Sequence, residues 1–212
     1  MKQAYFTSKT ILEQSKAFLE QVPRKKKIDF SERRPALLVL DMQQYFLDPE
    51  SHAYVPSAPA ILPNVLSLVK AFKEKGLPVI YTQHINRSED AGMMAVWWYH
   101  LLTPGHPLVG ISGEFDLEGA EVLVKSQYDA FYKTDLEARL AAADVTDVVI
   151  SGVVAHLCCE TTARAAFMRG LQVWFCVDGT ASYEAEFHLG TLRNLGHGFA
   201  VPVLSGEVIS AL

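Results

Sequence analysis

The stretch DVVISGVVAHLCCETTARAAFMRG, residues 147–170, decides the fold of this 212-residue chain. Residues 147–154 are rich in β-branched apolar side chains, which predicts a strand covered on both faces, as in a parallel sheet. The segment from Cys158 to Arg169 has helical spacing and ends before Gly170. A strand followed directly by a helix is the repeating unit of α/β proteins.

The same alternation extends in both directions from this stretch. Further strands are expected at 36–40, 77–82, 121–125, 171–177 and 199–203, and helices at 61–72, 136–143 and 184–195. This order predicts an α/β fold: a three-layer, doubly wound, Rossmann-like, mostly parallel six-stranded sheet with helices on both faces. Such sheets bind ligands beyond the carboxyl ends of the strands, where the strand order reverses.

Composition excludes several classes of protein. The formal net charge is −5 and the only basic cluster is the run Arg24–Lys27, so no nucleic-acid partner is expected. No apolar stretch approaches the ~18 residues of a membrane span. Residues 1–21 lack the apolar core of a signal peptide, so a cytoplasmic protein is expected. Three cysteines without a Cys-x-x-Cys pair indicate neither a disulfide framework nor a zinc site.

Three reactive side chains follow predicted strands. Asp41 and Lys125 end two of them, and Cys158 opens the helix after a third. The positive end of a helix dipole favours a thiolate, and a nearby lysine favours ionised partners. Each residue also has an ordinary structural interpretation: a turn cap for Asp41, a solvated face for Lys125 and core packing for Cys158. Core packing is the expected role of Cys159 and of Cys176, which lies mid-strand.

Four stretches together carry a resemblance to a known family: ALLVLDMQQYF (36–46), GLPVIYTQH (76–84), LVKSQYDAFYKTDLEARL (123–140) and VVISGVVAHLCCETTARAAFMRG (148–170). The chain resembles the isochorismatase-like cysteine hydrolases, which include nicotinamidases, N-carbamoylsarcosine amidases and isochorismatases. The resemblance runs from about Pro35 to Leu204. It divides the chain into an N-terminal extension, 1–34, which packs on the domain or on a partner subunit, and a hydrolase domain, 35–212.

The resemblance implies a mechanism and assigns its residues. Cys158 attacks the substrate carbonyl, Asp41 takes the thiol proton and later activates water, and Lys125 pairs with both charges. A non-proline cis peptide is implied at Val153–Val154, and it directs the N–H groups of Val154 and Cys158 at the oxyanion. The implied reaction is cleavage of a small-molecule amide or ureido C–N bond through a thioester, without a cofactor.

Two departures from the family pattern narrow this implication. Nicotinamidases carry an Asp-x-His metal pair after the second strand, where this chain reads TQHIN (82–86), so no metal is expected. His84 is expected to be a cleft-edge histidine or a hydrogen-bonded one rather than a ligand. Isochorismatases have glycine in place of Cys158 and a basic residue in place of Gln127. One alternative is therefore a vinyl-ether hydrolase driven by Asp41 alone; a second is a catalytically idle binding or assembly protein.

The substrate pocket is expected within and beside the long irregular segment from Asn86 to Phe115, because long loops in compact domains commonly form lids or binding walls. Aromatic side chains there could form an apolar wall for a small planar ligand, or instead belong to the core or a subunit interface. The expected substrate-binding residues are Phe46, Gln83, Trp97, Trp98, Tyr128 and Phe131, with Tyr99 in the same wall. His188 is expected at the surface or an interface, and the chain to form a homodimer or a higher homo-oligomer.

Overall fold

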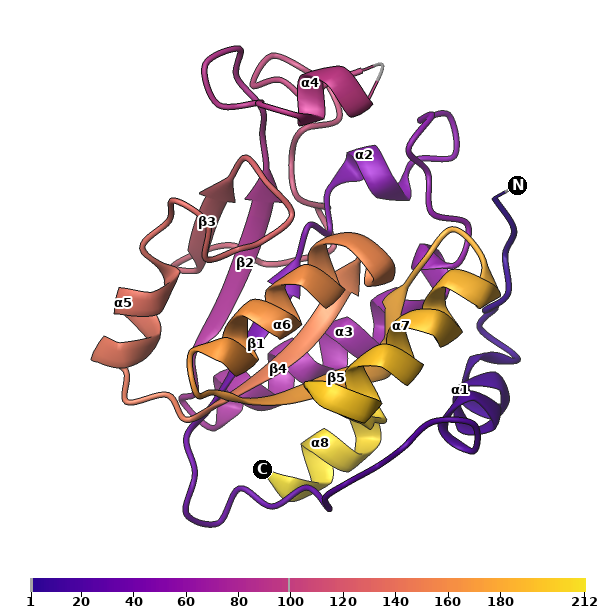
Figure 1. Cartoon of the computed structure of the whole chain (residues 1–212), viewed down its shortest axis with the longest axis vertical. Coiled ribbons are helices and arrows are strands. Elements are labelled where there is room, and N and C mark those ends of the chain that lie inside the picture. Colours follow the sequence, from indigo (N-terminus) through magenta and orange to yellow (C-terminus); the bar gives the residue numbers. More distant parts are fainter. Residues whose placement is uncertain (1, 99) are drawn as a thin grey trace.

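The computed structural model describes residues 2–98 and 100–212, and its centre is a six-stranded sheet (Figure 1). The strand order is β3-β2-β1-β4-β5-β6, and every pair of neighbouring strands is parallel, where the sequence predicted a mostly parallel sheet. The strands are β1 (Pro35–Leu40), β2 (Val79–His84), β3 (Glu121–Lys125), β4 (Asp147–Val153), β5 (Gln172–Ala181) and β6 (Val201–Val203).

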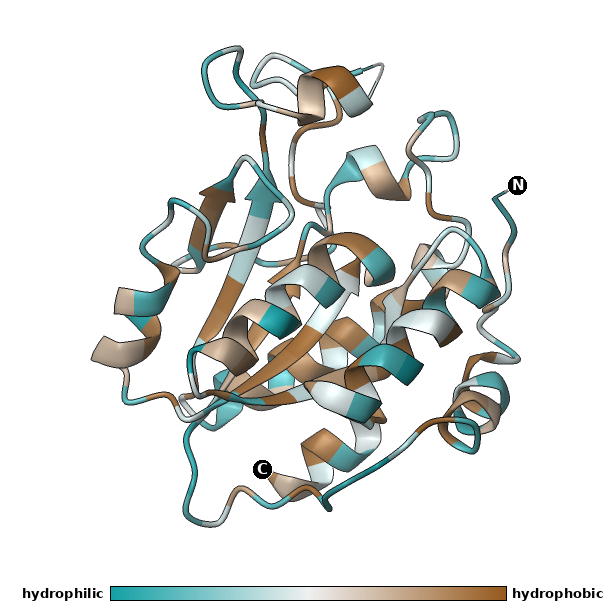
Figure 2. Ribbon diagram, in the orientation of Figure 1, coloured by the Kyte–Doolittle hydropathy of each residue, from teal (hydrophilic) through white to brown (hydrophobic). Residues whose placement is uncertain are grey.

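Helices cover both faces of the sheet, as predicted, and bury a separate apolar core on each. Alternate side chains of β1 serve the two cores: Leu37 and Val39 pack with α3, and Leu38 and Leu40 pack on the side of α5, α6 and α7. Figure 2 shows this apolar interior beneath the polar outer surfaces of the helices. The helices are α1 (Ile11–Leu19), α2 (Gln44–Leu47), α3 (Ala58–Glu74), α4 (Met94–Trp97), α5 (Leu136–Ala142), α6 (Glu160–Met168), α7 (Ala185–Gly198) and α8 (Ser205–Ala211).

The chain after β4 differs from the predicted helix. Residues Ala155–Cys159 form a π-helical turn, η1, and α6 begins only at Glu160. β5 also continues past its predicted end at residue 177, because a register shift opposite β4 lets Thr180 pair with Gly152. Cys158 therefore lies in a wide turn before the α-helix rather than at its first residue.

Gly152 determines how closely β1 and β4 approach at the switch in strand order. Its φ is +106°, and a Cβ atom built there would lie 2.0 Å from the carbonyl oxygen of Leu40. Only glycine has both this conformational freedom and this small size. The close approach brings the turn after β1, which carries Asp41, beside the turn after β4.

The N-terminal extension packs against the domain and covers His188. The Tyr5 hydroxyl is hydrogen-bonded to His188 Nδ1 at 2.9 Å and accepts a hydrogen bond from the backbone N–H of Ser182 at 2.8 Å. His188 Nε2 lies 3.0 Å from the Thr180 hydroxyl, and the imidazole is fully buried. The expectation of a surface or interface histidine was wrong, because Tyr5 and Phe6 cover this side of α7.

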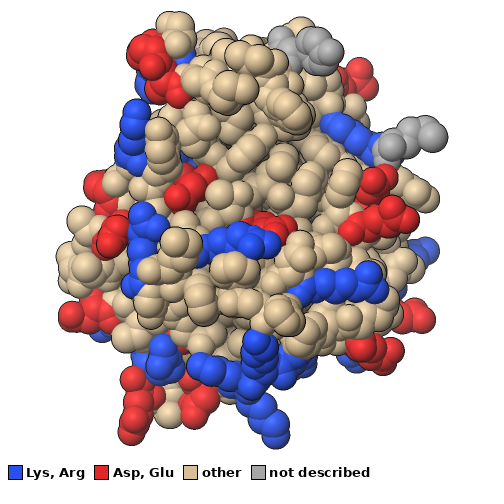
Figure 3. Space-filling view, viewed as in Figure 1, with Lys and Arg blue, Asp and Glu red and all other residues tan. Residues whose placement is uncertain are grey.

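The molecular surface carries charges of both signs. Acidic and basic side chains are interspersed on the face shown in Figure 3, and the net charge is −5. Within residues 2–98 and 100–212, no helix combines the length and the hydropathy that a bilayer crossing requires.

Candidate active site

Asp41, Lys125 and Cys158 meet in one buried cluster at the carboxyl ends of three strands. Asp41 follows β1 and adopts a left-handed conformation with φ of 49°, Lys125 is the last residue of β3, and Cys158 lies in η1 after β4. Lys125 Nζ lies 2.8 Å from Asp41 Oδ2 and 3.3 Å from Cys158 Sγ. One ammonium group thus contacts both the carboxylate and the thiol.

Neighbouring polar groups hold the carboxylate and the ammonium in place. The Thr82 hydroxyl on β2 donates to Asp41 Oδ1 at 2.6 Å and accepts from the Asp41 backbone N–H at 3.0 Å. Lys125 Nζ also donates to the carbonyl oxygen of Gln127 at 3.0 Å. Thr82 was not among the predicted site residues. The sequence signal that could have identified Thr82 is its position near the end of β2, the strand that pairs with β1.

Electrostatics keeps the ion pair charged. Burial by itself would raise the pKa of Asp41, but the Lys125 ammonium, with His84 and a hydrogen bond from Cys158, lowers that pKa below its ordinary value. Burial would likewise lower the pKa of Lys125, but Asp41 and Cys158 raise it. The resting site therefore holds a carboxylate and an ammonium at neutral pH.

The thiol is the neutral member of the cluster. Burial, followed by the Asp41 carboxylate, raises the pKa of Cys158 to about 12, against the opposing effect of Lys125. This is opposite to the thiolate expected from a helix N-terminus, because Cys158 is buried and faces a negative charge. The geometry suits transfer of the thiol proton to Asp41 as a new bond forms at sulfur.

The Asp41→Asn variant is expected to have a lower Cys158 pKa than the wild type. The substitution removes the second-largest cause of the raised pKa and leaves Lys125 facing the sulfur. At pH 8, the rate of alkylation by iodoacetamide should rise roughly tenfold for each unit by which the pKa falls. The rate would be measured against pH by peptide mass spectrometry in a Cys159→Ala background.

The matched control is Asp116→Asn, which removes a largely exposed carboxylate and should leave the alkylation profile unchanged. Wild-type Cys158 should react more slowly at neutral pH than a free cysteine peptide, and its rate should continue to rise above pH 8.5. Slower alkylation in Asp41→Asn than in the wild type would contradict the electrostatic argument.

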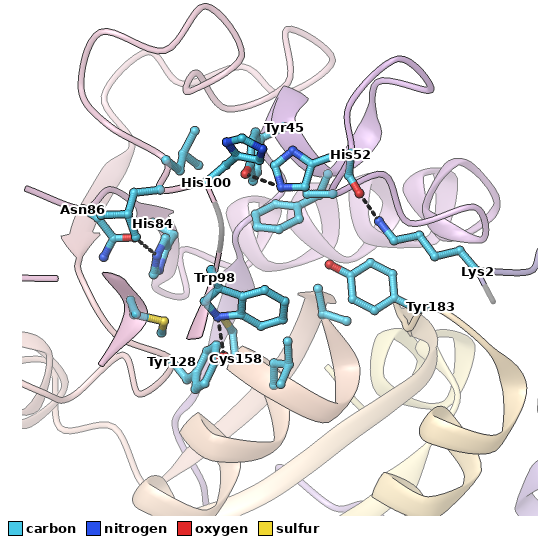
Figure 4. Close-up of a pocket in the computed structure, with 17 residues that line it drawn as sticks. Lys2, Tyr45, His52, His84, Asn86, Trp98, His100, Tyr128, Cys158 and Tyr183 are labelled. Atoms are coloured by element: carbon cyan, nitrogen blue, oxygen red, sulfur yellow. Dashed lines mark hydrogen bonds between the residues drawn. The ribbon is translucent and has the colours of Figure 1, made fainter. Parts of the chain in front are cut away.

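A cavity of about 160 Å³ opens above Cys158 (Figure 4). Its floor is formed by Val154, Leu157 and Cys158, and most of its other walls are aromatic. The remaining lining residues come from the N-terminal segment, the α2 region, the end of β2, α4 and its flanking loops, and the loops after β3 and β5: Lys2, Tyr45, Phe46, His52, Ala53, His84, Asn86, Met94, Trp98, His100, Leu101, Leu102, Tyr128 and Tyr183. A site of this size suits a small, largely planar ligand.

The structure divides the predicted substrate-binding residues into two groups. Phe46, Trp98 and Tyr128 line the cavity, and Trp98 Nε1 donates to the Tyr128 hydroxyl at 2.8 Å. The other three predicted substrate-binding residues do not line the cavity. Tyr99 lies outside the described residues.

Gln83, Trp97 and Phe131 do not line this cavity, each for a different reason. The Gln83 amide donates to the Val109 carbonyl, because alternation along β2 directs it away from the cavity that His84 lines. Trp97 is 72% exposed on α4, and Phe131 is buried in the core beside α5.

The peptide bond between Val153 and Val154 is cis, at the place that the family resemblance implied. It joins the end of β4 to η1, so it lies immediately before the turn that carries Cys158. Val154 and Cys158 both line the floor of the cavity.

His84 and Gln127 are held by neighbouring polar groups. His84 Nε2 is hydrogen-bonded to Asn86 Oδ1 at 2.9 Å, and burial lowers the pKa of His84 to about 4. The Gln127 amide donates to the backbone carbonyls of Asp90 and Ala91. In the part of the chain that the structure describes, no three His, Cys, Asp or Glu side chains form a group that could hold a metal ion.

Comparison with known proteins adds independent information. A family model described as the isochorismatase domain matches residues 35–207. Nicotinamidase 3 of Arabidopsis thaliana is 37% identical over 182 residues, which cover 82% of this chain and 87% of that protein. Enterobactin synthase component B of Escherichia coli is 29% identical over 86% of this chain, which spans 65% of that protein's length. A cysteine hydrolase from Pseudomonas syringae pv. phaseolicola superimposes with a TM-score of 0.81 and 27% identity, over 84% of this chain and 92% of that chain.

Proposed function

The chain belongs to the isochorismatase family, and on that premise we propose that it hydrolyses an amide or ureido C–N bond of a small molecule through a thioester on Cys158. One observation carries the proposal: Lys125 Nζ lies 2.8 Å from Asp41 Oδ2 and 3.3 Å from Cys158 Sγ, and Cys158 lines the floor of the cavity. This arrangement supports the proposed roles of Cys158 as nucleophile, Asp41 as base and Lys125 as electrostatic partner. The similarity to a nicotinamidase and to a cysteine hydrolase supports the same reaction class.

In the proposed first half-reaction, Cys158 Sγ attacks the carbonyl carbon while its proton passes to Asp41. The backbone N–H groups of Val154 and Cys158 are proposed to bind the oxyanion that develops. Collapse of the intermediate breaks the C–N bond, and the departing nitrogen takes the proton from Asp41. The products of this half-reaction are ammonia or an amine and an acylated Cys158, which is a thioester when the substrate is an amide and a thiocarbamate when it is a ureido compound.

In the second half-reaction, Asp41 accepts a proton from water as the water oxygen attacks the thioester carbon. The C–S bond then breaks, the acid leaves, and the proton returns from Asp41 to the sulfur. Lys125 remains an ammonium throughout and compensates whichever of its two neighbours is negative. Because the resting thiol is neutral, proton transfer is expected to accompany formation of the C–S bond rather than precede it.

The test is turnover of a panel of primary amides and ureido compounds, with release of ammonia as the readout. Reactions quenched in acid would then be searched by mass spectrometry for an acyl mass on the peptide that carries Cys158. Ammonia release together with the acyl adduct is the expected result. Turnover without any adduct on Cys158, or turnover that is restricted to vinyl ethers, would overturn the proposal.

A further inference from the structure

The N-terminal segment Lys2–Phe6, which lies outside the region matched by the family model, reaches the active-site cavity. The Gln3 backbone N–H donates to the Tyr183 carbonyl at 2.8 Å, and the Phe6 backbone N–H donates to the Ser57 hydroxyl at 3.1 Å. Phe6 is 1% exposed, so its burial anchors the segment. This anchoring places the side chain of Lys2 in the wall of the cavity.

The Lys2 ammonium lies between two other residues of the cavity wall (Figure 4). It donates to the backbone carbonyl of His52 and lies 4.3 Å from the centre of the Tyr183 ring. An ammonium group has three N–H donors, and the His52 carbonyl takes one of them. Lys2 therefore places a positive charge with further donor capacity in the cavity wall, beside the Tyr183 ring.

Two imidazoles extend this polar side of the cavity. The rings of His52 and His100 lie 5.1 Å apart, and His52 Nε2 is 3.1 Å from the Tyr45 hydroxyl. Burial, with the neighbouring imidazoles and Lys2, lowers the pKa of His52, so at neutral pH this ring is an uncharged hydrogen-bonding group. The fixed positive charge of this wall is that of Lys2.

The charged side chains near the cavity floor do not offer a second cation for an anionic ligand. The Lys125 ammonium is already paired with the Asp41 carboxylate. Gln127, where isochorismatases are expected to carry a basic residue, directs its amide at the carbonyls of Asp90 and Ala91. An anionic group on a ligand whose reacting carbon lies at Cys158 would therefore find its positive partner in the wall, at Lys2.

We propose that Lys2, together with the side chains of His52 and His100, forms a carboxylate subsite. The substrate is then a small amide or ureido compound that also bears a carboxylate, with the scissile carbonyl at Cys158 and the carboxylate at Lys2. The hydrolysis at Cys158 in this inference rests on the proposed function, whereas the binding of a carboxylate at Lys2 does not depend on it. It makes Lys2 a specificity-determining residue.

The test is a binding comparison that needs no turnover. Benzoate and benzamide have similar shapes and differ in charge, and their dissociation constants would be measured by calorimetry in a Cys158→Ala background. Benzoate should bind about tenfold more tightly than benzamide, as one partly desolvated charge-assisted contact provides. Lys2→Met should abolish this preference, whereas Lys2→Arg should keep it.

Lys9→Met is the matched control, because it removes an exposed lysine of the N-terminal extension that does not line the cavity. Equal binding of the two compounds, binding of neither, or a preference that survives in Lys2→Met would overturn the subsite. In the catalytically intact chain, Lys2→Met should raise KM for an N-carbamoyl amino acid about tenfold and leave kcat nearly unchanged. Hydrolysis of neutral amides without any preference for substrates that bear a carboxylate would overturn the subsite and leave the proposed hydrolase function standing. Binding of carboxylates at Lys2 without turnover of any substrate would support the subsite and overturn the proposed function.

Discussion

Replacement of Cys158 by alanine should lower the rate of amide hydrolysis by about 10⁴-fold or more, the loss expected when a covalent nucleophile is removed. The reason is that Sγ is the atom that would form the thioester. Neither Asp41 nor Lys125 can replace it in that role, because they already form an ion pair with each other. The measurement is kcat/KM on the best amide or ureido substrate of the panel, with the free energy of unfolding determined in parallel.

Cys159→Ala is the matched control for this substitution. Cys159 is the next residue, is fully buried and belongs to the apolar core beside α6, so its loss should change kcat/KM by no more than a few fold. A Cys158→Ala variant that keeps full amide activity would mean that the reaction does not proceed through this thiol. Activity on a vinyl ether that survives the same substitution would favour the reaction driven by Asp41. If the wild-type chain turns over no substrate of the panel, neither substitution can change a rate. That outcome would favour a binding or assembly role.

The fold could be predicted from sequence because its signals are local and repeated. The apolar run 36–40 and the stretch 147–170 have strand and helix patterns that tertiary contacts reinforce. The π-helical turn at Ala155–Cys159 could not be predicted this way, because its apolar residues fit an α-helical pattern equally well. The length of β5 depends on a register shift against β4, which exists only once the two strands pair.

The buried cluster of the site could be predicted from sequence because its three reactive residues lie at or just after the ends of strands. Asp41 and Cys158 follow strands and Lys125 ends one, and a parallel sheet brings those ends together. The residues of the cavity wall were harder to predict from sequence. Trp97 and Trp98 are adjacent in the loop 86–115, and the orientation of the short helix α4 decides which of the two side chains lines the cavity. Lys2 could not have been identified, since no local pattern shows that the N-terminal segment reaches the cavity.

Lys125→Met should lower the free energy of unfolding by about 3–5 kcal/mol at pH 7, the cost of leaving a buried carboxylate without its cation. In the wild type Lys125 lowers the pKa of Asp41, so this pair contributes stability that is present above the unfolded pKa of ~3.9 and lost as the pH falls. Without Lys125, burial dominates and raises the pKa of Asp41. The folded variant then favours the protonated acid, and its stability falls as the pH rises through that new pKa.

The difference in unfolding free energy between the wild type and Lys125→Met should therefore shrink as the pH is lowered from 7 toward 4. Urea unfolding at a series of pH values would measure it. The double variant Asp41→Asn/Lys125→Met leaves no buried charge in this pair and should recover most of the loss, because the Thr82 hydroxyl can still donate to the side-chain oxygen at position 41. Lys70→Met, at a lysine side chain that is 77% exposed, should change stability little at any pH. A difference that is independent of pH, or a double variant no more stable than Lys125→Met, would mean that Lys125 stabilises the fold by packing rather than by its charge.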